Sequence, residues 1–168
     1  HLYQPALLYL AIGRTTPAAL YRDQIQALRK VQERQFVESG SETDADVVAV
    51  AAKSELVCVN LTMIRAGRHL GDKTFFPQNA EGHEPAEVLQ AFIEQHYADK
   101  PVPPLILLNI ELDAEALGGV LTEQAHHPVR IVTRPIGERR VWVSMAEKNA
   151  LLAIEQRLSQ HATQETRL

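Results

Sequence analysis

The spacing of hydrophobic residues divides the chain into three stretches, of which residues 1–37 are predicted to be helical. Pro5 and Pro17 stand where helices can begin, and the segment from Gly13 to Pro17 separates them. The apolar stripe of the second helix consists of Ala18, Tyr21, Ile25, Leu28 and Val31, and the opposite face carries Asp23, Gln26, Lys30 and Glu33. A short helical hairpin is therefore expected.

The second stretch, residues 38–46, is polar, acidic and contains glycine, which is typical of a linker. A surface loop within one domain fits the same composition. Its acidic residues Glu42, Asp44 and Asp46 precede the first expected strand, so we expect solvated carboxylates there rather than a metal site.

The third stretch, residues 47–168, alternates apolar and polar residues with period two and then alternates strands with helices. We expect strands at Val47–Ala52, Leu56–Arg65, Arg68–Phe76, Leu105–Ile110 and Val129–Thr133, and helices from Pro85, from Asp113 to Ala125 and from about Arg139 to His161. Short connections such as Ala66-Gly67 make the first three strands antiparallel, and crossover helices add the last two in parallel. The expected fold is an α/β, ribonuclease-H-like mixed sheet of five strands, following the helical hairpin.

Composition narrows the class of protein. The 168 residues include 17 lysines and arginines against 21 acidic residues, and a net charge of −4 argues against a free-standing nucleic-acid binder. The single cysteine, Cys58, excludes an internal disulfide and favours a reducing, cytoplasmic compartment. The apolar run from Ala6 to Ile12 is too short to span a membrane. Because the chain begins at His1, we expect a fragment of a longer protein.

One basic cluster stands out against this acidic background, and it consists of Arg130, Arg134, Arg139 and Arg140. Pro135 and Gly137 form a loop that can present guanidinium groups to phosphates, although an ordinary solvated surface is an equal alternative. Trp142 can stack on a base or belong to the core. His126-His127 lacks a further ligand at metal-binding spacing, and Cys58 fits a small core hydrophobe.

Several segments stand in the order and spacing of one known family. They are Arg22–Arg29, Gln35–Val37, Asp46–Val50, Cys58-Val59, Arg65–Arg68, Leu70-Gly71, Phe75–Pro77, Thr133–Arg139, Asn149-Ala150 and Glu155–Leu158. These segments resemble UvrC, the incision subunit of the bacterial UvrABC excinuclease, over roughly residues 18–168.

The resemblance implies a role in nucleotide excision repair. In that family a GIY-YIG domain and a C-terminal ribonuclease-H-like domain cut DNA, and helix-hairpin-helix motifs grip it. The resemblance implies that this chain contains none of these three and corresponds to the middle of the protein, the UVR hairpin and the domain that precedes the C-terminal nuclease. The implied partners are damaged duplex DNA, other UvrC domains and UvrB, the last through Tyr21, Arg22, Ile25 and Leu28, with no membrane. The sequence departs from the family pattern at the hairpin loop, which is Thr15-Thr-Pro17, and in the helix Tyr3–Ile12, which matches poorly. Packing of the apolar stripe on its own domain is therefore the alternative to UvrB binding.

Two interpretations of the domain follow. Ribonuclease-H-like nucleases hold two divalent metals between carboxylates of the first strand and the end of the fourth strand, with a further ligand or proton donor on the last helix. Here Val47–Ala52 carries no carboxylate, Asn109 stands where the active family domain has aspartate, and Asn149 stands where it has histidine. We therefore expect a scaffold with no catalytic residue, metal or cofactor. The alternative, a nuclease using Asp44 or Asp46, Glu111 or Asp113, and Glu147, needs strand boundaries shifted by two residues.

Overall fold

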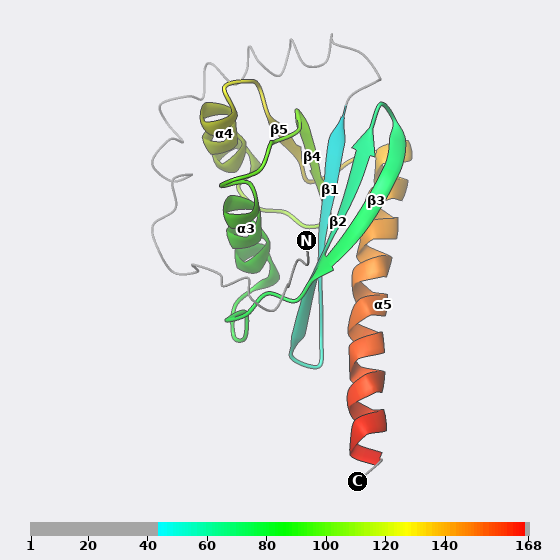
Figure 1. Cartoon of the computed structure of the whole chain (residues 1–168). Coiled ribbons are helices and arrows are strands. Elements are labelled where there is room, and N and C mark those ends of the chain that lie inside the picture. The colour runs from blue at the N-terminus through cyan, green and yellow to red at the C-terminus, as the bar shows by residue number, and fades with distance from the viewer. Residues whose placement is uncertain (1–43, 167–168) are drawn as a thin grey trace.

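The structure is a computed structural model that describes residues 44–166 (Figure 1). The expected helical hairpin, most of the expected linker and the UvrB-contact candidates Tyr21, Arg22, Ile25 and Leu28 lie outside the described residues.

The described chain forms a mixed sheet of five strands, as the sequence predicts. The elements are β1 (Ala45–Lys53), β2 (Leu56–Arg65), β3 (Arg68–Phe75), α3 (Pro85–His96), β4 (Leu105–Leu108), α4 (Ala114–Ala125), β5 (Arg130–Val132) and α5 (Glu138–Thr166). The spatial order of the strands is β3-β2-β1-β4-β5. β1, β2 and β3 are antiparallel neighbours, whereas β4 joins β1 in parallel and β5 joins β4 in parallel. This arrangement confirms the predicted ribonuclease-H-like topology.

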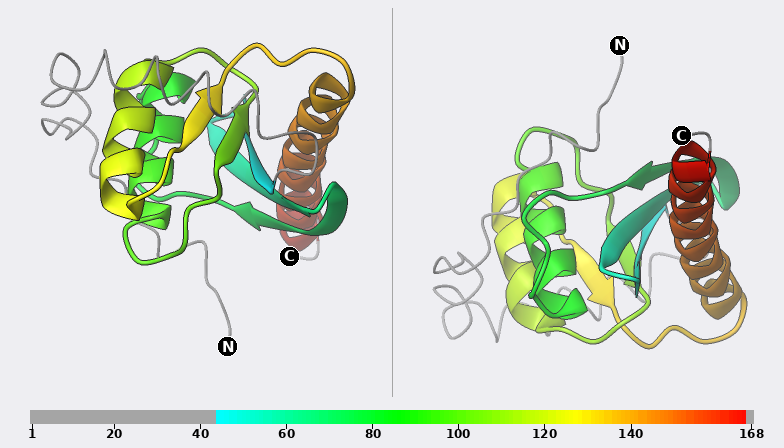
Figure 2. Two further views of the ribbon diagram at one scale, coloured as in Figure 1. Left: turned by 90° about the horizontal axis from the view of Figure 1, so that it is seen from above. Right: turned by 90° about the horizontal axis from the view of Figure 1, so that it is seen from below.

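The sheet is the middle of three layers, with α3 and α4 on one face and α5 on the other (Figure 2). Alternation along β1 explains both contacts. Val48 and Val50 belong to the cluster that packs on α3 and α4. Val47 and Ala49 belong to the cluster that contains Ala146 of α5. The side chains at this contact, Val47, Ala49 and Ala146, are small, so α5 can lie close against the strands.

Two tight hairpins connect the antiparallel strands. Ser54 and Glu55 have φ angles of 51° and 68°, and Ala66 and Gly67 have φ angles of 52° and 77°. Two successive residues with positive φ form the two-residue hairpin turn whose twist matches that of the strands. The predicted turn at Ala66-Gly67 is confirmed.

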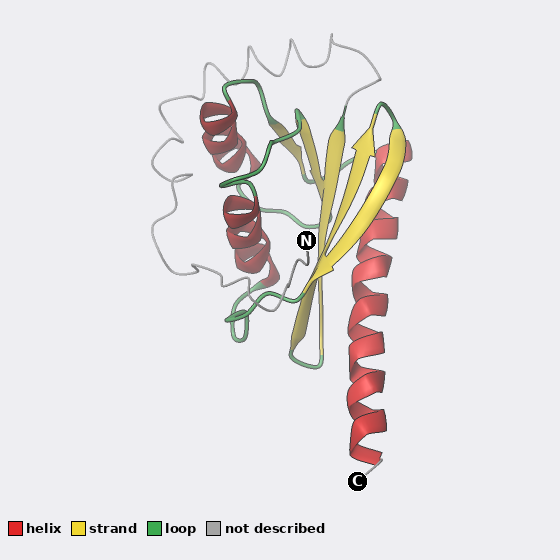
Figure 3. Cartoon of the chain, viewed as in Figure 1, coloured by secondary structure: helices red, strands yellow, loops and turns green. Residues whose placement is uncertain are grey.

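Three boundaries differ from the sequence prediction by two residues or more. β1 begins at Ala45, two residues earlier than expected, so Asp46 lies inside the strand with 3% of its surface exposed. The expectation of a solvated carboxylate at Asp46 is therefore wrong, because partners far along the chain compensate its charge. β4 ends at Leu108 and not at Ile110. α5 continues to Thr166 and runs past the edge of the sheet (Figure 3).

Residues expected in the core are found there. Cys58 is fully buried beside Ala150 and Ile154 of α5, and burial is the main cause that raises the pKa of its thiol to about 12. Trp142 is half-buried against the cluster beneath α5. No helix in the described range 44–166 has the length and apolar character needed to cross a membrane.

Burial of His96 makes the fold sensitive to acid. Its ring stacks on Phe92 at a centroid distance of 5.3 Å, and burial, followed by the charges of Lys100 and Lys73, lowers its pKa from 6.5 to about 4 against a weaker opposing effect of Asp99. The unfolded chain therefore binds this proton at a higher pH than the folded chain does. Its contribution to stability is complete above about pH 6.5 and is lost as the pH falls towards 4.

We expect His96→Phe to flatten the dependence of unfolding free energy on pH between about 6.5 and 4, because the variant has no proton to take up there. Urea denaturation at a series of pH values measures this slope. His161→Gln, at an exposed position, should keep the slope of the original chain. An unchanged slope in His96→Phe would show that other groups cause the acid sensitivity.

Candidate functional site

The side chain of Asn109 extends the pairing of β4 with β1 beyond the end of the strand. The Val50 N–H donates to Asn109 Oδ1 at 2.9 Å, and Asn109 Nδ2 donates to the Val50 carbonyl at 2.9 Å. A side-chain amide offers one acceptor and two donors, so it can satisfy both backbone groups of one residue. The Asn109 side chain therefore continues the hydrogen bonding between β4 and β1 by one residue beyond the end of β4.

The second N–H of the same amide holds α5. Asn109 Nδ2 donates to Glu147 Oε2 at 2.9 Å, which links β4, β1 and α5 through one side chain. An aspartate at this position would direct a carboxylate oxygen at the Val50 carbonyl and at the Glu147 carboxylate. The surroundings of position 109 therefore select an amide and disfavour a metal-binding carboxylate.

The part of β1 beside Asn109 has only aliphatic side chains. Leu108, the last residue of β4, pairs with Val48, and the following β1 residues are Ala49, Val50 and Ala51. None of these side chains has a metal-binding atom. Asn149 of α5 is half-buried and likewise neutral.

The single carboxylate of β1, on Asp46, lies in a buried polar cluster at the other end of the strand. Arg65 Nη1 donates to Asp46 Oδ1 at 3.0 Å, and the Tyr97 hydroxyl donates to Asp46 Oδ2. The same guanidinium nitrogen donates to the Ala45 and Ile64 carbonyls at 3.0 and 2.9 Å. Burial, followed by the charge of Asp46, raises the pKa of Tyr97 well above its usual value. Both oxygens of Asp46 are thus engaged in holding β1, β2 and the end of α3 together.

The other carboxylates of the nuclease alternative also have separate structural partners. Asp44 accepts from the Ala66 N–H at 2.9 Å, and Asp113 accepts from the Ala116 N–H at 3.1 Å as the cap of α4. Glu111 forms an ion pair with Arg134. Among residues 44–166, no group of three or more His, Cys, Asp or Glu side chains is arranged to hold a metal ion. The residues present therefore do not fit the metal pair of a ribonuclease-H-like nuclease.

The four arginines of the basic cluster follow one another from β5 into the first turn of α5. Arg130 and Arg139 are half-buried, whereas Arg134 and Arg140 are exposed. Glu111 offsets the charge of Arg134, with 79% of the Arg134 side chain and 61% of the Glu111 side chain exposed. The sequence alone did not reveal this pair because 23 residues separate its members.

A polar row on β2 and β3 was not anticipated. Asn60 Nδ2 donates to Thr62 Oγ1 at 3.0 Å, and Thr62 Oγ1 donates to Asp72 Oδ1 at 2.5 Å. His69 Nε2 lies 3.2 Å from Asp72 Oδ2. Burial by itself would raise the pKa of Asp72, but the hydrogen bonds from Thr62 and His69 outweigh it and the pKa is lowered. The only sequence signal was the alternation of polar residues along β2.

The two adjacent histidines gain no metal-binding context from the fold. His126 ends α4 with a φ of 61°, and His127 Nδ1 lies 3.1 Å from the Pro128 carbonyl. Both side chains are exposed.

Comparison with known proteins agrees with the topology. The family model described as the UvrC Ribonuclease H-like domain matches residues 44–157. The chain belongs to the UvrC ribonuclease H-like domain family. In this UvrC domain, the matched residues begin one position before β1 and include most of α5.

Proteins named UvrABC system protein C are close relatives of this UvrC domain. The protein from Nitrosomonas europaea is 55% identical over 153 residues, covering 90% of this chain and 25% of the relative. The protein from Methylobacillus flagellatus is 51% identical over 151 residues with the same coverage, and that from Neisseria gonorrhoeae is 43% identical over 156 residues, again covering 90% and 25%. The chain thus spans about a quarter of the length of these relatives.

Proposed function

We propose that this chain is the middle part of a UvrC-type subunit of a cytoplasmic nucleotide excision repair nuclease, and that it acts there as a non-catalytic scaffold. The names of the relatives support the repair assignment, since each is called UvrABC system protein C. Within such a protein, a folded domain without a metal centre can hold other parts in position for incision.

The observation that carries the scaffold proposal is the use of Asn109. Both N–H groups and the oxygen of its amide are engaged, by Val50 and Glu147. Two-metal hydrolysis needs carboxylates that converge on the ions. Here the corresponding end of β4 supplies an amide that fastens the sheet to α5, which is a structural use of the position.

We expect the purified chain to cut no DNA. The assay incubates it with nicked, single-stranded and lesion-bearing duplex DNA in Mg²⁺ and in Mn²⁺. Metal-dependent cleavage that disappears in Glu147→Gln would overturn the scaffold proposal and support a nuclease. Cleavage that persists in Glu147→Gln would indicate a contaminating enzyme, and its removal on further purification would restore the scaffold proposal.

We also propose that the basic cluster Arg130, Arg134, Arg139 and Arg140 provides whatever weak contact this region makes with DNA. The cluster is exposed at Arg134 and Arg140, in a chain whose net charge is negative. Phosphate contacts of this kind give affinity that does not depend on sequence and falls with salt.

Replacing Arg134 and Arg139 by alanine should weaken DNA binding about equally for different sequences and make the salt dependence shallower by about one unit per lost phosphate contact. Fluorescence anisotropy at several salt concentrations measures both effects. Lys73→Ala with Lys100→Ala removes the same charge elsewhere and should change affinity less. Equal losses in the two double variants would mean that net charge, and not this cluster, determines binding.

UvrB and the remaining UvrC domains are the other partners that we propose. The candidate contact face, Tyr21, Arg22, Ile25 and Leu28, rests on the resemblance and on the apolar stripe of that segment.

A further inference from the structure

Helix α5 carries a second apolar stripe that faces away from the sheet. Val141, Met145 and Leu152 are 55%, 56% and 46% exposed. At 3.6 residues per turn these three positions lie within about 40° of one another. The residues of α5 that pack on the strands lie on the opposite side, and they are Val143, Ala146, Ala150 and Ile154.

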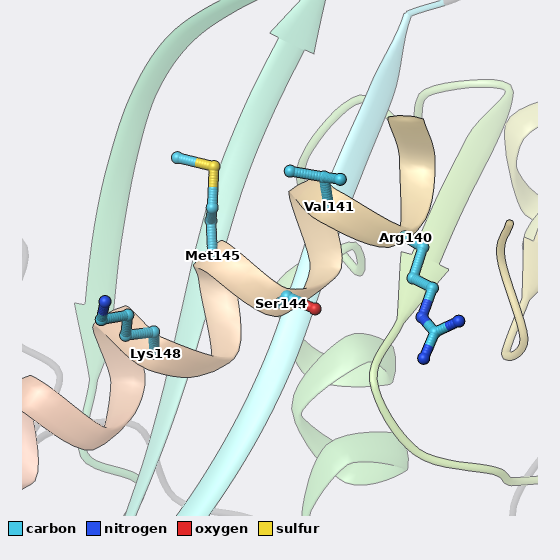
Figure 4. A pocket seen from close by; sticks show the side chains of 5 residues that line it. All are labelled: Arg140, Val141, Ser144, Met145 and Lys148. Atoms are coloured by element: carbon cyan, nitrogen blue, oxygen red, sulfur yellow. The ribbon is translucent and has the colours of Figure 1, made fainter. Parts of the chain in front are cut away.

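The first half of this stripe borders a shallow hollow of about 270 Å³ lined by Arg140, Val141, Ser144, Met145 and Lys148. Figure 4 shows the side chains of Val141, Met145 and Lys148 projecting from the same side of α5. The spacing Val141, Met145, Lys148, Leu152 alternates gaps of four and three residues, which is the seam by which one helix packs along another.

The small size of the stripe favours a tethered occupant over a free partner. A stable complex between separate proteins usually buries about 1,200–2,000 Å² in total. The four side chains of the seam, those of Val141, Met145, Lys148 and Leu152, extend along about three helical turns. The area that they can bury is much smaller than this. A segment of the same chain needs less contact area, because a short tether gives it an effective concentration in the millimolar range.

The chain enters the domain on the sheet-facing side of α5, at the end of the helix where this stripe begins. Ala45, the first residue of β1, packs in one cluster with Val143 and Ala146 of α5. The segment before β1 therefore joins the domain at the same end at which α5 begins (Figure 1). Residues 38–44 can reach about 24 Å when extended, so a helix that ends near Val37 has enough connecting chain to lie along α5.

That preceding segment has an apolar stripe of matching length. The predicted helix of residues 17–37 presents Tyr21, Ile25, Leu28 and Val31 on one face. The stripe from Tyr21 to Val31 is about 15 Å long, and the stripe on α5 from Val141 to Leu152 is about 16 Å long. The opposite face of the helix predicted within residues 17–37 is polar, which suits a helix that covers a surface and faces water.

We propose that the helix predicted within residues 17–37 packs through Tyr21, Ile25 and Leu28 onto the stripe formed by Val141, Met145 and Leu152 of α5. The contact covers the face of residues 17–37 that is also the candidate contact for UvrB. In the isolated chain, a partner that binds this face has to displace it from α5. The packing itself does not depend on the proposed repair function.

The two methionines of the chain provide a direct test. Met145 lies in the stripe, whereas Met63 pairs with Asp46 across β1 and β2, so its side chain shares the sheet face of Asp46 and points away from α5. In the full 168-residue chain labelled with ¹³C at the methionine methyl groups, Ile25→Asp should shift the Met145 resonance and leave the Met63 resonance in place. Gln26→Asp, on the opposite face of the predicted helix, should shift neither.

Three results would overturn the proposal. The first is a Met145 resonance that is the same in the original chain and in Ile25→Asp. The second is an equal shift in Ile25→Asp and Gln26→Asp, which would reflect charge alone. The third is a Met145 shift that appears only at high protein concentration, which would identify a second copy of the chain as the occupant. An unchanged Met63 resonance shows in every case that the domain stays folded.

Discussion

Replacing Arg65 by methionine is expected to lower the free energy of unfolding by about 3 kcal/mol, the lower end of the usual cost of removing one partner from a buried ion pair, because 33% of the Arg65 side chain is exposed. The carboxylate of Asp46, with 4% of its side chain exposed, would lose the guanidinium 3.0 Å away. The Ala45 and Ile64 carbonyls would lose a donor as well. Urea denaturation at neutral pH measures the change.

Arg68→Met provides the matched control, because Arg68 pairs with Arg65 across the β2–β3 hairpin but is exposed. We expect a change within about 0.5 kcal/mol, as for most surface substitutions. Tyr97→Phe should fall between the two, since it removes one hydrogen bond to a charged acceptor. If Arg65→Met and Arg68→Met have the same stability, the charge of Asp46 is compensated by water and not by Arg65.

Asn109→Asp is the second substitution with a large expected effect, a loss of about 1–3 kcal/mol at neutral pH. The new carboxylate would replace two donated hydrogen bonds of 2.9 Å by repulsion from the Val50 carbonyl and Glu147. These neighbours disfavour its charged form and so raise its pKa in the folded chain. The loss is therefore greatest at neutral pH and becomes smaller as the pH falls and the carboxyl group takes up a proton.

Combining Asn109→Asp with Glu147→Gln isolates the electrostatic part. The glutamine can donate to the new carboxylate, so the double variant should recover some of the stability that Asn109→Asp loses. Asn109→Asp should also cut no DNA in Mg²⁺ or Mn²⁺, because one added carboxylate does not make a two-metal site. A stable Asn109→Asp variant would mean that the amide is not required for the junction of β4, β1 and α5.

Periodicity in the sequence predicted most of the fold because most of the fold is built from local patterns. β2 and the start of α3 at Pro85 lie where alternation and proline chemistry place them. The mixed topology followed from short hairpins and helical crossovers. Each of these signals is contained within about ten neighbouring residues.

The features that the sequence did not reveal depend on contacts between distant residues. Asp46 resembled part of an acidic linker because Glu42 and Asp44 precede it. Its actual partners, Arg65 and Tyr97, are 19 and 51 residues away. No local pattern shows that a carboxylate has such partners, so the first strand was predicted to begin two residues too late.

The candidate site shows the same limit. The identity of Asn109 was enough to predict that the end of β4 lacks a carboxylate. What the amide does there depends on Val50 and Glu147, which are 59 and 38 residues away. The residue could be singled out from the sequence, but its structural use could not.

The long helix α5 also has a mechanical consequence. Its buried contacts with the sheet extend to Ile154, with Leu158 half-buried beyond it, and its backbone continues in the same helix to Thr166. The last two turns or so therefore form a stiff arm about 12 Å long, clamped at one end. When the sheet rotates, the end of this helix moves with it as a rigid extension. Anything joined there therefore follows the orientation of the domain.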